Sequence, residues 1–245
     1  MKDNFSNQAA VYAKYRPRYP LALFEYIVSF VKDKKLAWDC GTGNGQTAKE
    51  LSKYFESVYA TDISSKQIEH AVKEKNIIYS IEPAEETGIN DRTTDLVTVS
   101  QALHWFNFDK FYQEVKRVSK PEGLIAVWTY SLLQIDPVTD PLIHTYHFET
   151  LETYWDVERK YVDDGYRTIP FPFKQISTPE FFIEVNWDLQ DLEGYFNTWS
   201  ALQKFIAVNN HNPIPALIKE IAQNWPATET RKIIFPIHLK MAYVH

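Results

Sequence analysis

The chain has 245 residues, 44% of them hydrophobic, which suits one substantial domain better than a string of small modules. Lys and Arg number 26 and Asp and Glu number 32, so the formal net charge is −6 and no basic surface for a nucleic acid is indicated. Cys40 is the only cysteine, which excludes an internal disulfide and a cysteine-based zinc site.

No targeting or membrane signal is visible in the sequence. The opening residues, MKDNFSNQAAVYAKY, have the pattern of neither a signal peptide nor a transit peptide. No apolar run reaches the roughly 18 residues that span a bilayer. We therefore expect a soluble, cytoplasmic protein whose partner is a small molecule and not a nucleic acid or a membrane; the oligomeric state is not indicated.

The first 130 residues alternate between helical and strand-like patterns. Helices are expected after Pro20, over 46–55, after Ser64 and after Asn107, where Ser64 and Asn107 are suitable N-caps. Strands are expected at five apolar runs: 36–40, 58–63, 77–81, 95–101 and 124–130. Such alternation predicts an α/β fold with a parallel sheet and helices on both faces.

The pattern changes after Tyr130. Helical stretches and proline-rich connections over 131–180 predict a cap insertion that lies over the sheet. Further elements are expected in the last third, namely a strand at 181–187, helices over 189–206 and 215–225, and a strand at 232–244. We predict a single domain over 1–245, divided into an N-terminal lid and helix (1–35), a cofactor-binding core (36–130), the cap (131–180), and the rest of the sheet with the substrate side (181–245).

The segment DCGTGNG, residues 39–45, follows the first expected strand and holds three of the chain's seven glycines. Bare backbone between a strand and its helix lets a ligand approach the main chain closely. Gln46 and Thr47 follow the last glycine, so the Lys and Ser or Thr of a P-loop are missing. The spacing is GxGxG, which differs from the GxGxxG of a dinucleotide site, although an NAD oxidoreductase stays an alternative to test.

Two carboxylates accompany this loop. Asp39 at its mouth would repel a pyrophosphate but attract an amine, which favours S-adenosylmethionine, whose ammonium group is expected near Asp39. Asp62 ends the second strand, where an acceptor for ribose hydroxyls is expected in either type of site. The two acids and the glycines therefore predict S-adenosyl-L-methionine as cofactor, S-adenosyl-L-homocysteine as product, and no metal.

DCGTGNG resembles the first motif of the class I S-adenosylmethionine-dependent methyltransferases. The resemblance continues, in the family's order, through TDIS, PAEETGI, DLVTVSQALHWF and EVKRVSKPEGLIAVW, and is thinner after residue 130. YAKYRPRYP, QALHWF and TWSA are similar to a small-molecule branch, with a methyltransferase type 11-like domain, that includes trans-aconitate methyltransferase and its fungal relatives. The family implies a Rossmann-like seven-stranded sheet, mostly parallel, with an antiparallel last strand.

The resemblance also implies contacts with the cofactor. Gly41 and Gly43 would pass under its methionine part. Asp62 would hold the ribose hydroxyls, and Ile63 would touch the adenine. These four residues form the expected floor of the cofactor site.

Two further contacts are implied by the resemblance. Many members have an acidic residue after the third strand that binds the adenine, and Pro83 stands in its place here. Ala84 or Glu85 is therefore expected to take over that contact. Gln101 is expected near the cofactor, at the end of the fourth strand.

The chemistry is expected beyond the fourth strand, where His104 and Trp105 should face the crevice. Methyl transfer from a sulfonium is an in-line displacement, so most of the catalysis can come from holding the acceptor on axis in a dry site. A carboxylate acceptor needs no base, whereas a phenol, amine or thiol often uses one. His104 is the candidate catalytic residue; the alternative is that it only shapes the pocket.

The segment YAKYRPRYP precedes the core and is expected to form a lid. Tyr12 and Arg16 are expected on the cofactor, with Arg16 paired to a carboxylate of the cofactor or the substrate. The alternative is a surface arm whose tyrosines pack on the core. The aromatic residues expected to line the substrate side are Tyr15, Trp105, Tyr130 and Trp199, with Arg231 as a second substrate cation.

The sequence thus predicts a methyltransferase that moves a methyl group from S-adenosylmethionine to a small-molecule acceptor, with a carboxylate as the acceptor group considered. One alternative is an N- or C-methyltransferase acting on another metabolite, because the fold does not determine the acceptor. Another is a scaffold that binds the cofactor without turnover.

Overall fold

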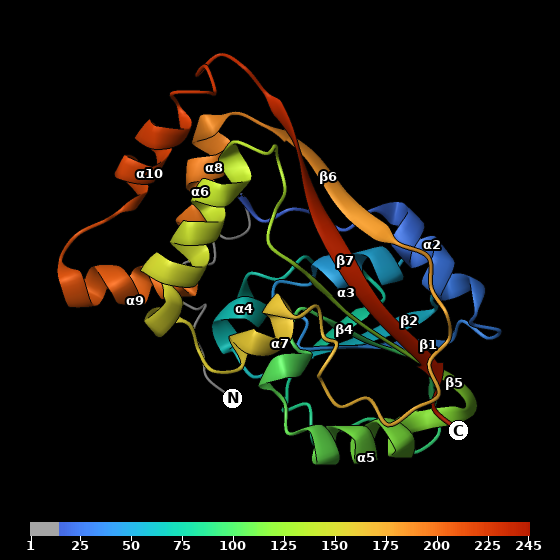
Figure 1. Ribbon diagram of the computed structural model, residues 1–245. Helices are drawn as coiled ribbons and strands as arrows, with labels where there is room; N and C mark the ends of the chain where they lie inside the picture. The colour runs from blue at the N-terminus through green and yellow to red at the C-terminus, as the bar shows by residue number, and fades with distance from the viewer. Residues whose placement is uncertain (1–14) are drawn as a thin grey trace.

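The computed structural model describes residues 15–245 and shows one seven-stranded sheet with a group of helices beyond one of its ends (Figure 1). The strand order is β3-β2-β1-β4-β5-β7-β6. β7 runs antiparallel to both of its neighbours, and the other strands are parallel. The expected mostly parallel sheet with an antiparallel last strand is confirmed.

The strands alternate with helices through the first half of the chain. The strands are β1 (Leu36–Cys40), β2 (Ser57–Asp62), β3 (Ile77–Ile81), β4 (Thr94–Ser100), β5 (Ser119–Tyr130), β6 (Phe181–Trp187) and β7 (Arg231–Tyr243). The helices of the first half are α2 (Leu21–Ser29), α3 (Gln46–Leu51), α4 (Ser65–Glu69) and α5 (Phe108–Val118), with a 3₁₀ turn, η1, at Leu103–Trp105.

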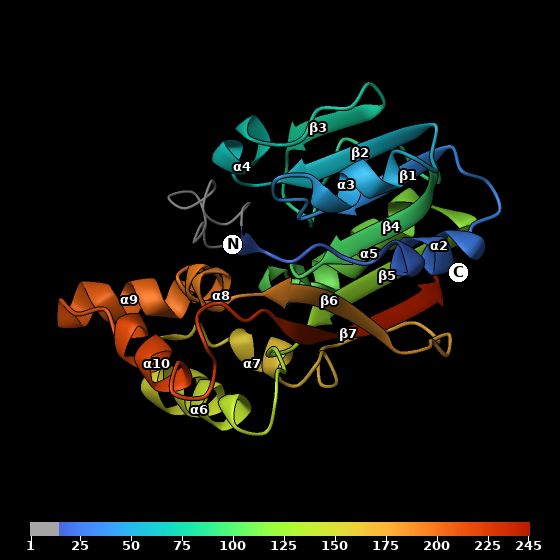
Figure 2. The ribbon, with the colours of Figure 1, turned by 90° about the horizontal axis from the view of Figure 1, so that it is seen from above.

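The second half adds helices in two places. Between β5 and β6 lie α6 (Thr139–Thr145), a π-helical turn η2 (Tyr146–Thr150), a 3₁₀ turn η3 (Glu152–Tyr154) and α7 (Arg159–Asp163). Between β6 and β7 lie α8 (Leu189–Phe196), α9 (Ser200–Asn209) and α10 (Ile214–Ile221). Figure 2 shows α6, α8, α9 and α10 gathered beside one end of the sheet, where α4 also lies. We refer to α6–α10, with η2 and η3, as the cap.

The order of the strands determines where a ligand can bind. β1 pairs with β2 on one side and with β4 on the other, so the chain reverses its winding direction between β1 and β4. In open sheets of this kind, ligands bind beyond the carboxyl ends of the strands at this switch point. The loop after β1 and the η1 segment after β4 both lie there.

The expected caps are confirmed by hydrogen bonds. The side chains of Ser64 and Asn107 accept hydrogen bonds from the backbone amides of Gln67 and Lys110, so α4 and α5 begin as expected. The helix expected over 189–206 is instead broken into α8 and α9. At this break the carbonyl of Tyr195 accepts hydrogen bonds from both the amide and the hydroxyl of Thr198.

β5 begins at Ser119, five residues before the strand expected at 124–130. The pairing of β4 with β5 jumps from Thr94–Ser119 to Leu96–Leu124, so residues 120–123 form a bulge within a longer strand.

Among residues 15–245, no helix is long and apolar enough to cross a membrane.

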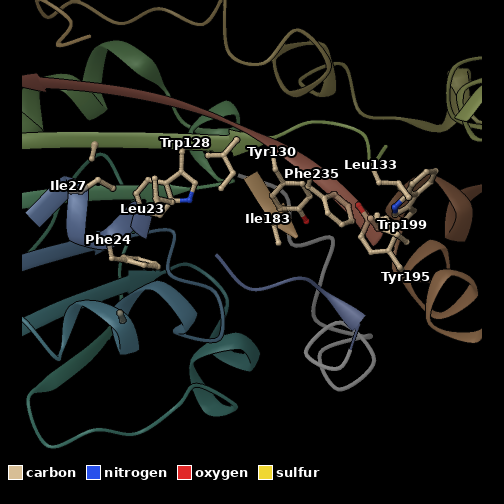
Figure 3. Close-up of a cluster of buried hydrophobic side chains, with 14 of the residues drawn as sticks. Leu23, Phe24, Ile27, Trp128, Tyr130, Leu133, Ile183, Tyr195, Trp199 and Phe235 are labelled. Carbon is tan, nitrogen blue, oxygen red and sulfur yellow. The ribbon is translucent and has the colours of Figure 1, made fainter. Parts of the chain in front are cut away.

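A continuous aromatic core joins the sheet to the cap (Figure 3). The fully buried ring of Trp128 on β5 meets Phe24 of α2 edge-on, with ring centroids 6.1 Å apart. Further along the sheet, Phe235 packs against Tyr130 and against Tyr195 of α8. Because the cap shares its core with the sheet, its position over the strand ends is determined by the same packing that stabilises the fold.

Candidate active site

One cavity lies between the strand ends and the cap. From the sheet side it is lined by residues of the glycine loop and of the segments after β2 and β4, among them Gly41, Thr42, Gly43, Asp62, Ile63, Ser64, Gln67, Gln101, His104 and Trp105. From the N-terminal segment, the end of β5 and the cap it is lined by Arg16, Tyr19, Tyr130, Trp155, Asp156, Arg159, Val162 and Ser200. Residues far apart in the sequence thus share one chamber.

The glycine loop has room for a ligand against its backbone. Gly41 and Gly43 have φ values of +66° and +56°, which side chains disfavour. A Cβ on Gly41 would lie 2.7 Å from the Cβ of Ala102, so this glycine allows close packing against the segment after β4. A Cβ on Gly43 would meet nothing within 4 Å, because this position borders the open cavity.

Asp39 supports the loop from below and does not line the cavity. Its carboxylate is fully buried and accepts hydrogen bonds from the hydroxyls of Thr42 (2.5 Å) and Thr98 (2.9 Å). Burial raises the pKa of Asp39 to about 6, against the opposing effect of these two bonds. In the structure Asp39 holds Thr42, which does line the cavity.

Asp62 lies at the end of β2 with its carboxylate at the cavity wall. It accepts hydrogen bonds from the amides of Gly43 and Ser64, each 2.9 Å long. The two amides fix the carboxylate next to the glycine loop. Ile63 lines the cavity beside it, so the pair expected for ribose and adenine stands together.

The residues expected on the adenine after β3 are placed elsewhere. Ala84 is buried in the core, and Glu85 accepts a hydrogen bond from the amide of Asn107 at the start of α5. Neither lines the cavity, whereas Ser64 and Gln67 at the start of α4 do. The sequence predicted Ser64 only as a helix cap and did not place Ser64 or Gln67 at the cavity.

Gln101 lines the cavity in a left-handed backbone conformation, with φ of +56°. Its side-chain oxygen accepts hydrogen bonds from the Thr129 hydroxyl (2.6 Å) and the Tyr130 amide (3.0 Å). These bonds tie the end of β4 to β5. The strained backbone at this point turns the chain into the segment that carries His104.

His104 faces the cavity from η1 and is nearly buried. Its Nδ1 lies 2.8 Å from the hydroxyl of Tyr166, a fully buried residue with φ of +60°. Burial, together with the positive charge of Arg159, lowers the pKa of His104 to about 3. The imidazole is therefore neutral at physiological pH.

Arg16 and Tyr130 meet at the cavity wall. The Arg16 Nη1 donates to the Tyr130 hydroxyl over 2.6 Å, and the guanidinium lies 5.3 Å from the centre of the Tyr195 ring. Tyr15 does not line the cavity, because its ring lies against Gly194 of α8. This agrees with the alternative of a tyrosine that packs on the core.

Three other expected residues also lie away from the cavity or outside the described chain. Trp199 is buried among the aromatic rings of the cap, and it is the next residue, Ser200, that lines the cavity. Arg231 is held by Asp136 and Glu229 and does not line the cavity. Tyr12 lies outside the described residues.

The cap supplies charged residues that the sequence did not single out. Asp156 forms an ion pair with Lys204 of α9 at 2.6 Å. Arg159, in the first turn of α7, stacks on Trp155, with its guanidinium carbon 4.5 Å from the ring centre. No local motif marks these residues, since only the folding of the cap over the strand ends brings them to the cavity.

The residues that are present fit a nucleoside cofactor. An open approach at Gly43 lies beside a positioned carboxylate, Asp62, which can accept hydrogen bonds from a ribose diol. Within residues 15–245, no group of three or more His, Cys, Asp or Glu side chains is arranged to hold a metal ion.

Comparisons with known proteins decide the family. The model of a methyltransferase domain matches residues 38–127. A Dictyostelium discoideum protein that is named provisionally as a methyltransferase is 34% identical over 97% of this chain and 93% of its own length. The chain belongs to the class I S-adenosylmethionine-dependent methyltransferases.

Two further relatives agree with this assignment. CRG1 of Saccharomyces cerevisiae, named as a probable S-adenosylmethionine-dependent methyltransferase, is 30% identical over 69% of this chain and 60% of its own length. A solved structure from Anaeromyxobacter dehalogenans, described provisionally as a type II methyltransferase, has a TM-score of 0.88 and 33% identity, covering 94% of this chain and 98% of that one. The methyltransferase thus uses S-adenosylmethionine as its methyl donor.

The raised pKa of Asp39 predicts how stability depends on pH. A carboxyl with a raised pKa contributes stability at low pH that is lost as pH rises through about 6. We expect the free energy of unfolding of Asp39→Asn, measured relative to the wild type, to be about 1–3 kcal/mol higher at pH 8 than at pH 4. Urea denaturation at both pH values measures it, with the exposed Asp33→Asn as control. A relative free energy of unfolding that is equal at the two pH values, or higher at pH 4, would contradict the burial argument.

Proposed function

We propose that this methyltransferase transfers a methyl group to a carboxylate of a small molecule and so forms a methyl ester. The observation that carries the proposal is that two guanidinium groups, of Arg16 and Arg159, line the same cavity as the glycine loop. Guanidinium groups bind a carboxylate through paired, charge-assisted hydrogen bonds and do not bind an amine in this way. The cap over the strand ends and the net charge of −6 favour a small, dissolved metabolite over a nucleic acid, with the cytoplasm as the place of action.

The cofactor is proposed to bind along the floor of the cavity. Asp62 would accept hydrogen bonds from the ribose hydroxyls, with Ile63 against the adenine. Gly41 and Gly43 would pass under the methionine part, and Asp39 would act through Thr42 by holding the loop in shape. This orientation directs the reactive end toward the side of the cavity that carries His104 and Arg159.

Positioning is the main catalytic contribution that we propose for the protein. When bound, S-adenosylmethionine supplies a methyl carbon on a sulfonium, so an oxygen–carbon bond forms as the carbon–sulfur bond breaks and the electron pair stays on sulfur. The cavity walls formed by Trp105, Tyr130 and Trp155 would exclude water and hold the acceptor oxygen in line, roughly 3 Å from that carbon. A carboxylate loses no proton in this step.

His104 is proposed as a hydrogen-bonding wall residue and not as a base. A group whose pKa is lowered to about 3 holds an abstracted proton poorly, so it would give little help to a phenol or amine acceptor. The hydrogen bond between its Nδ1 and the Tyr166 hydroxyl fixes the orientation of the ring. Nε2 is the nitrogen that does not take part in this bond. A carboxylate acceptor fits this neutral imidazole, because the reaction then requires no base.

The proposal is tested by product chemistry. The enzyme is incubated with methyl-labelled S-adenosylmethionine and a panel of small carboxylates, amines and phenols. We expect label to enter carboxylates and to be released as volatile methanol by mild alkali, as methyl esters are. Label that resists alkali, as in N-methyl, C-methyl or phenyl ether products, would contradict the proposal.

Asp62→Ala is expected to weaken binding of S-adenosylhomocysteine about 10- to 100-fold, since hydrogen bonds to a charged acceptor are lost. Isothermal titration calorimetry measures the affinity. Asp33→Ala, which removes an exposed carboxylate away from the cavity, is the matched control and should leave the affinity unchanged. Equal affinities of Asp62→Ala and the wild type would remove Asp62 from the cofactor site.

His104→Asn is expected to lower kcat/KM about tenfold through lost hydrogen bonding, without changing the shape of the pH profile between pH 5 and 8. An acid limb near pH 6 that persists in the variant would point to another group, such as Asp39, whose pKa burial raises to about 6. Steady-state rates across this range decide the matter. A limb present in the wild type and missing in His104→Asn would make His104 the base.

A further inference from the structure

Arg159 lies in α7 of the cap, and the Nε atom of its guanidinium is already hydrogen-bonded within the cap. Its Nε donates to Oδ1 of Asp163, 2.8 Å away and one helical turn on, while the plane of the group lies over Trp155. Burial would raise the pKa of Asp163, but its bond with His147 and the charge of Arg159 lower it below its ordinary value. The ionised Asp163 and the indole therefore hold the guanidinium in one orientation.

The other edge of this guanidinium is available to a ligand. The terminal nitrogens Nη1 and Nη2 of Arg159 make no hydrogen bond with any residue in the described part of the chain, yet Arg159 lines the cavity. The remaining charged groups of the cavity are engaged: Arg16 donates to Tyr130, Asp156 pairs with Lys204, and Asp62 accepts from two amides. A guanidinium that is held in one orientation and lines a cavity with two unbonded terminal nitrogens can bind a carboxylate through two parallel hydrogen bonds.

We propose that Arg159 is the specificity-determining residue of this methyltransferase and binds the carboxylate of the acceptor through Nη1 and Nη2. This inference rests on the proposed function and assigns its substrate recognition to a residue of α7. A carboxylate offers about four lone-pair sites, so two can accept from Arg159 while another points at the methyl carbon. Arg159 thereby selects anionic acceptors and orients the attacking oxygen.

A carboxylate suits this site better than a phosphate. Asp163 forms an ion pair with Arg159 and offsets much of the positive charge there. A carboxylate carries one charge and has two oxygens in a plane, which match the two free nitrogens Nη1 and Nη2 of Arg159. A phosphate dianion would need further hydrogen-bond donors.

The test measures binding without turnover. The enzyme is saturated with S-adenosylhomocysteine and titrated calorimetrically with a panel of short-chain carboxylates and with their matched carboxamides and phosphonates. The wild type is expected to prefer carboxylates. Arg159→Gln should weaken carboxylate binding about 10- to 100-fold and abolish the preference over carboxamides. Arg159→Lys keeps the positive charge but loses the pair of parallel N–H donors, so it should retain only part of the preference for carboxylates over carboxamides.

Arg231→Gln is the matched control, because Arg231 also stacks on a tryptophan and pairs with carboxylates but lies outside the cavity. It should leave the preference unchanged. The affinity for S-adenosylhomocysteine, expected to be the same in all variants, shows that each is folded; should Arg159→Gln lose that affinity, Arg159→Lys carries the test.

The outcomes separate the two proposals. If the wild type prefers carboxylates and the Arg159 variants keep that full preference, the role of Arg159 is overturned while the proposed function stands. If the wild type itself shows no preference for carboxylates over carboxamides, both are overturned. Tighter binding of phosphonates than of carboxylates by the wild type would overturn the assignment of the ligand to this residue.

Discussion

The buried carboxylate of Asp39 is the constraint from which the site is built. It lies in the middle of the sheet, on the strand where the winding direction reverses, and its bonds with Thr42 and Thr98 join the loop after β1 to β4. The amide of Thr42 also donates to the carbonyl of Thr61 on β2, so the loop is tied on both sides. A loop with so little side-chain packing of its own thereby keeps its backbone exposed to the cavity.

The cap completes the chamber because it is continuous with the core. Aromatic packing runs from Trp128 at the centre of the sheet through Phe235 to Tyr195 in the cap. α7 packs through Val162 in a separate buried cluster that includes Leu103 of η1, and this packing brings the charged groups around Arg159 to the cavity. The cofactor side is thus made by the sheet and the acceptor side mainly by the cap, which explains how one fold can serve different acceptors through changes in the cap.

The alternation of patterns over the first 130 residues was sufficient to predict the parallel strands β1 to β5, because apolar runs and N-caps such as Ser64 are local signals, whereas the antiparallel last strand was expected from the family resemblance. Residues at the cofactor side of the cavity were also predictable from the sequence. Gly41, Gly43 and Asp62, which the resemblance placed at the cofactor, line the cavity. The orientation of Asp39 and the position of Arg159 could not be predicted from the sequence, because both depend on tertiary packing. Asp39 looks the same in sequence whether its carboxylate faces a ligand or Thr98, and the approach of Arg159 to His104 joins segments more than fifty residues apart.

A crystal structure of the methyltransferase with S-adenosylhomocysteine tests the central claim most directly, since it shows which carboxylate meets the ligand. The account predicts that Asp39 keeps its hydrogen bonds with Thr42 and Thr98, and that Asp62 lies within hydrogen-bond distance of the ribose hydroxyls. An Asp39 side chain turned into the cavity to contact the ligand's ammonium group, or a ligand bound away from the glycine loop, would contradict it.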